Sequence, residues 1–131
     1  MTRILVIDDE ADIRDGFAMI LERAGYVVGT AANGREGVAL HKVSPFDVVI
    51  ADLFMPVQDG IETIIDLRRD FPDIKIIAVS GGGRRGLAKN FLSSATMFGA
   101  DLALTKPISI ADLCNAVEEV LAGTGTPPEP S

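Results

Sequence analysis

Residues 46–56 are Phe-Asp-Val-Val-Ile-Ala-Asp-Leu-Phe-Met-Pro, the clearest structural signal in the chain. Its centre, Val48 to Ala51, is apolar at every position, which is typical of a strand covered on both faces of a parallel sheet. Asp52 interrupts the apolar run, and Pro56 favours a loop after it. The pattern therefore predicts an acidic side chain at the carboxyl end of a buried strand.

Similar short apolar runs recur along the chain, and amphipathic stretches separate them. The predicted strands cover residues 4–7, 27–31, 47–53, 74–79 (with Ser80 as the last residue) and 102–105. Helical spacing of apolar residues predicts helices over 11–23, from Asn33-Gly34 to about Lys42, from Ile61 to the break at Phe71-Pro72-Asp73, over 87–98 and over 110–121. Asn33-Gly34 suits a turn or a helix N-cap, and Ser109 together with Asp112 suits a helix start.

Five strands alternating with five helices predict an α/β, doubly wound (βα)5 fold with a five-stranded parallel sheet. The expected strand order is 2-1-3-4-5. In this order the first and third strands are neighbours, and ligands bind beyond their carboxyl ends, where the winding reverses.

The overall composition indicates one domain that stays in the cytoplasm. The 131 residues suffice for a single core, which we place at 1–122, whereas the Gly-, Thr- and Pro-rich residues 123–131 read as a flexible tail with no output domain after it. No apolar stretch approaches the roughly 20 residues of a membrane span, and no signal region precedes the first strand. A net charge of −7 weighs against direct binding to nucleic acid.

Acidic residues follow two of the predicted neighbouring strands. Asp8 and Asp9 come directly after the first strand, and Asp52 ends the third. Three carboxylates at one rim repel each other, and a bound divalent cation relieves that repulsion. Mg²⁺ is the expected ion, because it takes hard oxygen ligands and is often shared between carboxylates and phosphate. His41, expected on an exposed helix face, and Cys114, expected as a core thiol, offer no zinc site.

Two further polar residues end strands at the same rim, Ser80 on the fourth and Lys106 on the fifth. An aspartate can attack a phosphoryl donor and form an acyl phosphate. A cation, an amine and a hydroxyl can then share the charge of the transferred group. These residue types together indicate phosphoryl transfer to Asp52.

The whole pattern resembles the receiver-domain signature of response regulators, over roughly residues 3–122, and the family has the flavodoxin-like fold. The resemblance rests on Asp8-Asp9-Glu10, Asp52-Leu-Phe-Met-Pro56 with Asp59-Gly60, Ser80-Gly81 and Lys106-Pro107. It implies that Asp52 is the phosphoacceptor and that Asp8 and Asp9 are the acidic pair. Asp9, Asp52 and the backbone carbonyl of Phe54 would ligate Mg²⁺.

The resemblance also implies that Ser80 bonds the phosphoryl group, that Lys106 pairs with it, and that the Lys106-Pro107 bond is cis. The implied phosphodonor is a histidine kinase or a histidine phosphotransfer protein. The output would be a phosphorylation-dependent contact with a further protein. Such a domain is no enzyme, apart from catalysing its own phosphorylation and dephosphorylation.

Two departures from the family leave an alternative open. Ala103 stands where most receivers have a Tyr or Phe that reorients on activation, and residues 81–86 lengthen the segment between Ser80 and Lys106. The glycine-rich loop is no P-loop, because Leu87 and Ala88 stand where a P-loop needs a lysine and a hydroxyl residue.

We hypothesise that this loop transmits the response in place of the aromatic ring. The alternative is a receiver-like module that binds its partner without phosphorylation. A small hydrolase with an aspartate nucleophile would need a second acid two residues after Asp52 as proton donor, and Phe54 stands at that position.

Overall fold

The computed structural model of the chain describes residues 1–53, 60–80 and 99–123. The strands are β1 (Arg3–Ile7), β2 (Val27–Ala31), β3 (Val48–Asp52), β4 (Lys75–Ser80) and β5 (Leu102–Thr105). The helices in these ranges are α1 (Ala11–Arg23), α2 (Gly34–Val43), α3 (Gly60–Asp70) and α5 (Ile110–Leu121). None of these helices has the length and apolar character of a membrane span. The predicted helix 87–98, the loop 81–86, Phe54 and residues 124–131 of the tail lie outside the described residues.

The strands form one parallel sheet in the order β2-β1-β3-β4-β5, which confirms the predicted doubly wound topology. The boundaries differ from the prediction by about one residue. β3 begins at Val48, and the carboxylate of Asp47, directly before it, accepts a hydrogen bond from the Arg3 backbone N–H at 2.8 Å. β4 begins at Lys75 because the Ile74 N–H closes a turn onto the Phe71 carbonyl.

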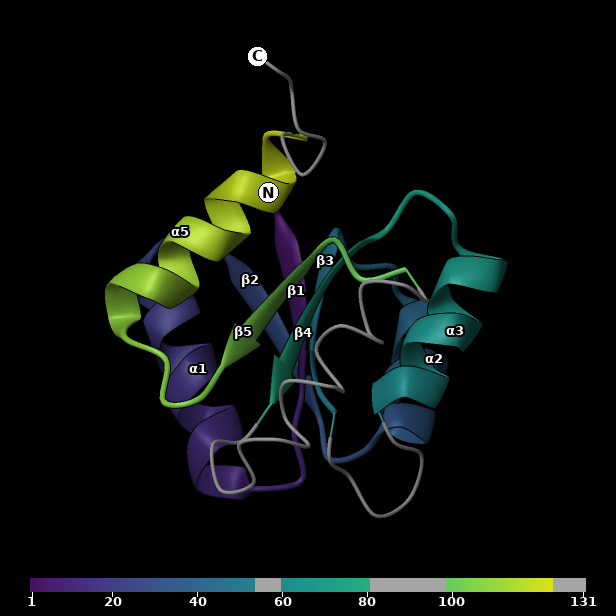
Figure 1. Cartoon of the computed structure of the whole chain (residues 1–131), viewed down its shortest axis with the longest axis horizontal. Helices are drawn as coiled ribbons and strands as arrows, with labels where there is room; N and C mark the ends of the chain where they lie inside the picture. Colours follow the sequence, from purple (N-terminus) through teal and green to yellow (C-terminus); the bar gives the residue numbers. More distant parts are fainter. Residues whose placement is uncertain (54–59, 81–98, 124–131) are drawn as a thin grey trace.

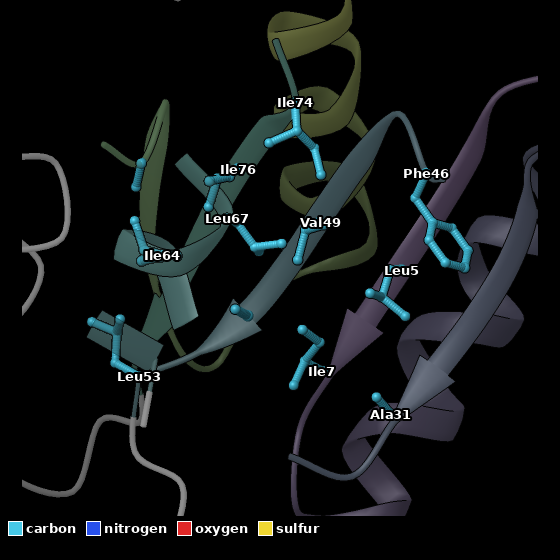
Figure 2. Packing of buried hydrophobic residues seen from close by; sticks show 13 residues of the cluster. Leu5, Ile7, Ala31, Phe46, Val49, Leu53, Ile64, Leu67, Ile74 and Ile76 are labelled. Atoms are coloured by element: carbon cyan, nitrogen blue, oxygen red, sulfur yellow. The ribbon is translucent and has the colours of Figure 1, made fainter. Parts of the chain in front are cut away.

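The sheet separates two apolar layers, and neighbouring residues of one strand serve opposite layers. Figure 1 shows α1 and α5 on one side of the sheet and α2 and α3 on the other. Ile4 and Val6 of β1 pack with α1 and α5. Leu5 and Ile7 belong to the opposite cluster, on the side of α2 and α3, where Ile7 lies against Gly37 of α2; Figure 2 shows this cluster. Because both faces of this strand are buried, its residues are apolar at successive positions and do not alternate between apolar and polar.

The predicted helix starts at Asn33 and Ser109 are confirmed as N-caps. The Asn33 side chain accepts a hydrogen bond from the Glu36 N–H at 2.8 Å, and the Ser109 hydroxyl accepts one from the Asp112 N–H at 3.0 Å. Each cap satisfies a backbone donor that the helix itself leaves unpaired.

The predictions for two polar positions need correction. His41 is buried, with 3% of its surface exposed, where an exposed helix residue was expected. Its Nδ1 accepts a hydrogen bond from the Phe46 N–H at 3.0 Å, and its ring meets Phe71 edge to face. The buried face of α2 consists of Gly34, Gly37 and His41, and a Cβ at Gly37 would collide with the Ile7 side chain, so this glycine lets the helix approach the sheet closely. Cys114 is a free thiol of intermediate exposure, not a fully buried one.

Candidate functional site

Each predicted site residue that the structure describes lies at the carboxyl end of a strand. Asp8 and Asp9 follow β1, Asp52 is the last residue of β3, Ser80 is the last of β4, and Lys106 follows β5. The register pairs Ile7 with Ala51 and Asp52 with Val79, so these ends meet at one rim. In Figure 2, Ile7 and Leu53 mark this rim.

The three aspartates form a tight carboxylate cluster. One carboxylate oxygen each from Asp8, Asp9 and Asp52 lies within 4.8 Å of the others. Asp8 and Asp52 are buried, whereas Asp9 is exposed, so the cluster opens to solvent on the side of Asp9. The sequence prediction that neighbouring strands bring these acids together is confirmed.

Lys106 holds its ammonium group between two of these acids. Its Nζ lies 2.9 Å from Asp8 Oδ2 and 3.4 Å from Asp52 Oδ2. Burial lowers the pKa of the ammonium group, but the hydrogen bond to Asp8 and the charges of Asp52 and Asp8 outweigh it and raise the pKa. The lysine therefore stays charged beside Asp52.

Backbone contacts fix the neighbouring strand ends. The Lys106 N–H donates to the Ser80 carbonyl at 2.7 Å, which ties the end of β5 to that of β4. Ser80 itself is fully buried. The peptide bond between Lys106 and Pro107 is cis, as the resemblance implied.

Both carboxylate oxygens of Asp8 are engaged by the protein. Oδ1 accepts a hydrogen bond from the Glu10 N–H at 2.9 Å, and Oδ2 accepts one from Lys106. Asp9, the exposed member of the cluster, is therefore better placed than Asp8 to ligate an ion directly.

Arg14 also supports this site, although no sequence motif marks it. From the first turns of α1, its guanidinium donates to the Asp8 backbone carbonyl at 2.9 Å. The contact holds the turn that carries Asp8 and Asp9. A hydrogen bond from a side chain to a backbone carbonyl requires no particular residue type at the acceptor position, so it leaves no sequence motif. The only sequence feature that points to this contact is a cationic residue early in the helix.

The donor set fits Mg²⁺. Three carboxylates face one ammonium group, so the cluster retains negative charge, and all the described donors in it are hard oxygens. Asp9 and Asp52 would hold the ion, with Asp8 beside them. The carbonyl of Phe54, the remaining predicted ligand, lies outside the described residues.

Comparisons with known proteins agree with this geometry. The response regulator receiver domain family matches residues 4–118. The chemotaxis protein CheY of Thermotoga maritima is 34% identical over 119 residues, which are 90% of this chain and 96% of that protein. The receiver protein CpdR of Brucella abortus is 34% identical over 92% of this chain and 98% of its own length. The chain spans only 12% of the sensor kinase CckA of Brucella abortus, to which it is 36% identical over 90% of its own length.

Solved structures show the same architecture. A receiver domain protein from Clostridium thermocellum superposes with a TM-score of 0.86 at 29% identity, over 95% of this chain and 97% of that one. CheY4 of Vibrio cholerae gives a TM-score of 0.81 at 31% identity, over 92% of this chain and 98% of that one. Fold, strand-end site and family match together show that the chain belongs to the response regulator receiver domains of two-component systems.

Proposed function

We propose that Asp52 accepts a phosphoryl group from a phosphohistidine of a histidine kinase or histidine phosphotransfer protein, with Mg²⁺ bound, in the cytoplasm. The observation that carries this proposal is the ammonium group of Lys106, which lies 2.9 Å from Asp8 and 3.4 Å from Asp52 inside the carboxylate cluster. A lysine bridging a buried acid and the acceptor is suited to a phosphoryl group arriving on that acceptor.

In the transfer, a carboxylate oxygen of Asp52 forms a bond to phosphorus while the bond between phosphorus and the donor's imidazole nitrogen breaks. The nitrogen keeps the electron pair and can take up a proton from solvent. Lys106, already charged, pairs with an oxygen of the new acyl phosphate, and the Ser80 hydroxyl bonds another. When bound, Mg²⁺ neutralises charge on the phosphoryl oxygens.

The same proposal covers what the chain does afterwards. It acts on no other substrate and catalyses only its own phosphorylation and dephosphorylation. Phosphorylation shifts the population toward a conformation that gains contacts at Ser80 and Lys106, and a further protein binds that conformation. We further propose that residues 81–90 transmit the response. Amide exchange in these residues is then expected to change on phosphorylation.

A second candidate, partner binding without phosphorylation, is favoured by one residue. Ala103 on β5 is partly buried against the α2 and α3 layer. Its methyl group cannot make the rotation of a large aromatic ring. The two candidates separate in a binding assay, because only the first predicts that Asp52→Asn changes the affinity for the partner.

Intact-mass analysis after incubation with acetyl phosphate and Mg²⁺ tests the proposal. We expect one phosphoryl adduct on the wild type and none on Asp52→Asn. Asp15→Asn is the matched control, because Asp15 is an exposed acid on α1, and it should be phosphorylated like the wild type. A wild type that gains no phosphoryl group would refute the proposal.

A further inference from the structure

A surface cavity of about 410 Å³ lies at the opposite end of the sheet from Asp52. His41, Phe46, Phe71 and Ile74 are among its lining residues. In Figure 2, Phe46 and Ile74 lie at one end of the sheet, and Ile7 and Leu53 lie at the other. The cavity is therefore separate from the phosphorylation site and is not used by the proposed phosphoryl transfer.

The walls are apolar and the rim is acidic. Two aromatic rings and Ile74 form apolar wall surface, and Asp47, Asp70 and Asp73 contribute carboxylates. All the lining residues belong to the described ranges, and no lysine or arginine is among them. The combination of apolar rings with carboxylates suits an organic cation, whose stem contacts the rings while its charge meets the acids.

The three carboxylates differ in their own partners. Asp47 accepts a hydrogen bond from the Arg3 N–H, and Asp70 pairs with Arg69 through both oxygens, at 3.0 and 3.2 Å. Asp73 has no hydrogen bond or ion pair within residues 1–53, 60–80 and 99–123. Its carboxylate is therefore the one most available to an incoming cation.

His41 is one of the residues that line the cavity, and one of its ring nitrogens has a partner within the chain. Because its Nδ1 accepts from the Phe46 N–H, the neutral ring carries its proton on Nε2. In the part of the chain that the structure describes, Nε2 has no hydrogen-bond acceptor. The edge-to-face contact with Phe71, at 4.4 Å between ring centroids, offers at most a weak one. Water or an acceptor of a bound partner can satisfy such a buried donor.

We propose that this cavity binds an arginine side chain presented by an extended segment of a partner protein, with His41 donating to a backbone carbonyl of that segment. A planar guanidinium can both stack on an aromatic ring and pair with a carboxylate. The rim already shows this chemistry, since the Arg3 guanidinium lies 4.8 Å from the centroid of the Phe46 ring.

The exposure of the rim favours a protein segment over a free small molecule. Pro45, Asp47, Asp70, Pro72 and Asp73 are all exposed. Sites for small ligands enclose most of the ligand surface, whereas an open hollow with an acidic edge suits a single side chain held in place by its own protein. Among the described residues, Arg3, Arg69 and Lys42 lie near the rim but do not line the cavity. Their positive charges weaken the attraction between the rim carboxylates and an incoming cation.

The test is an NMR titration of the full, ¹⁵N-labelled chain with the peptide acetyl-Gly-Arg-Gly-amide. We expect saturable shifts of the backbone amides of Phe46, Asp47 and Asp73 and of the His41 Nε2–H. Asp73→Asn should weaken binding by about two- to fivefold, as expected for an exposed ion pair. Asp15→Asn on α1 should leave it unchanged, and so should Asp52→Asn, whatever the outcome of the phosphorylation experiment.

Two comparison ligands make the outcome decisive. The same peptide with citrulline in place of arginine keeps the shape without the charge, and it should bind more weakly than the arginine peptide. Butylguanidine keeps the alkyl stem and the single charge of the guanidinium without a peptide carbonyl and should also bind more weakly. Equal binding of the citrulline peptide, or butylguanidine binding as tightly as the arginine peptide, would overturn the proposal, as would the absence of saturable shifts at the cavity.

Discussion

The Lys106 Nζ lies 2.9 Å from Asp8 Oδ2, and the two residues are 98 positions apart in the sequence. The contact joins the end of β5 to the end of β1 across the intervening ends of β3 and β4. It places a charged amine next to Asp52 before any phosphoryl group arrives, so little rearrangement is needed for the lysine to pair with it.

Lys106→Met should lower the free energy of unfolding by about 1–3 kcal/mol in Mg²⁺-free buffer, because two buried carboxylates lose their countercharge. Added Mg²⁺ should restore part of the loss. Urea unfolding with and without Mg²⁺ measures both effects. Lys42→Met, on the exposed surface of α2, is the control and should change stability little. Equal stability of Lys106→Met and wild type would show that the ion pair contributes nothing.

Asp9→Asn should weaken Mg²⁺ binding by about tenfold or more, as changes around metal sites commonly do. Asp9 is the exposed member of the carboxylate cluster, so the change removes one charged donor with little effect on packing. Calorimetric titration with Mg²⁺ gives the affinity. Asp12→Asn, an exposed acid in the first turn of α1, should bind as the wild type does. An unaltered affinity in Asp9→Asn would remove Asp9 from the ligand set.

Gly60→Ala should destabilise the protein by about 1–3 kcal/mol, as overpacking does, and slow phosphorylation. A Cβ at Gly60 would lie 2.5 Å from the Asp52 carbonyl oxygen, so the start of α3 must move away from the acceptor strand. Gly16→Ala is the matched control, since nothing lies within 4 Å of a Cβ there, and within α1 it should stabilise by roughly 0.5–1 kcal/mol. Thermal unfolding and the phosphorylation rate check both variants. Similar behaviour of the two would contradict the close approach.

His41 should make stability depend on pH. Burial lowers the pKa of its imidazole in the folded state below that in the unfolded chain. Protonation then favours the unfolded state, so stability is complete above the ordinary histidine pKa near 6.5 and falls as the pH drops from there toward the folded-state pKa. Urea unfolding between pH 7.5 and about 5 measures the fall. His41→Leu should flatten the profile in this range, and an unchanged profile would exclude His41 as its cause.

The fold and the site rim were predictable because they rest on local patterns. A parallel sheet needs continuously apolar strands, and residues 4–7 and 48–51 have that composition. Once the strand order is known, polar residues at strand ends must gather at one edge, and Asp8, Asp52 and Lys106 do so.

His41 and Arg14 were missed for identifiable reasons. The buried face of α2 is built from Gly34, Gly37 and His41, and glycine adds nothing to an apolar periodicity. The apolar pattern of this helix therefore predicts the histidine on its exposed face. Arg14 acts through a backbone carbonyl, and such contacts depend on the path of the chain and not on residue type.

Locating the modified residue tests whether the phosphoryl group is carried by Asp52, as we claim. Borohydride reduces an aspartyl phosphate to homoserine, so the wild-type chain is treated with acetyl phosphate and Mg²⁺, reduced, digested and sequenced by mass spectrometry. We predict homoserine at position 52 and unmodified aspartate at Asp8 and Asp9. Homoserine at Asp8 or Asp9, or at no position, would contradict the claim.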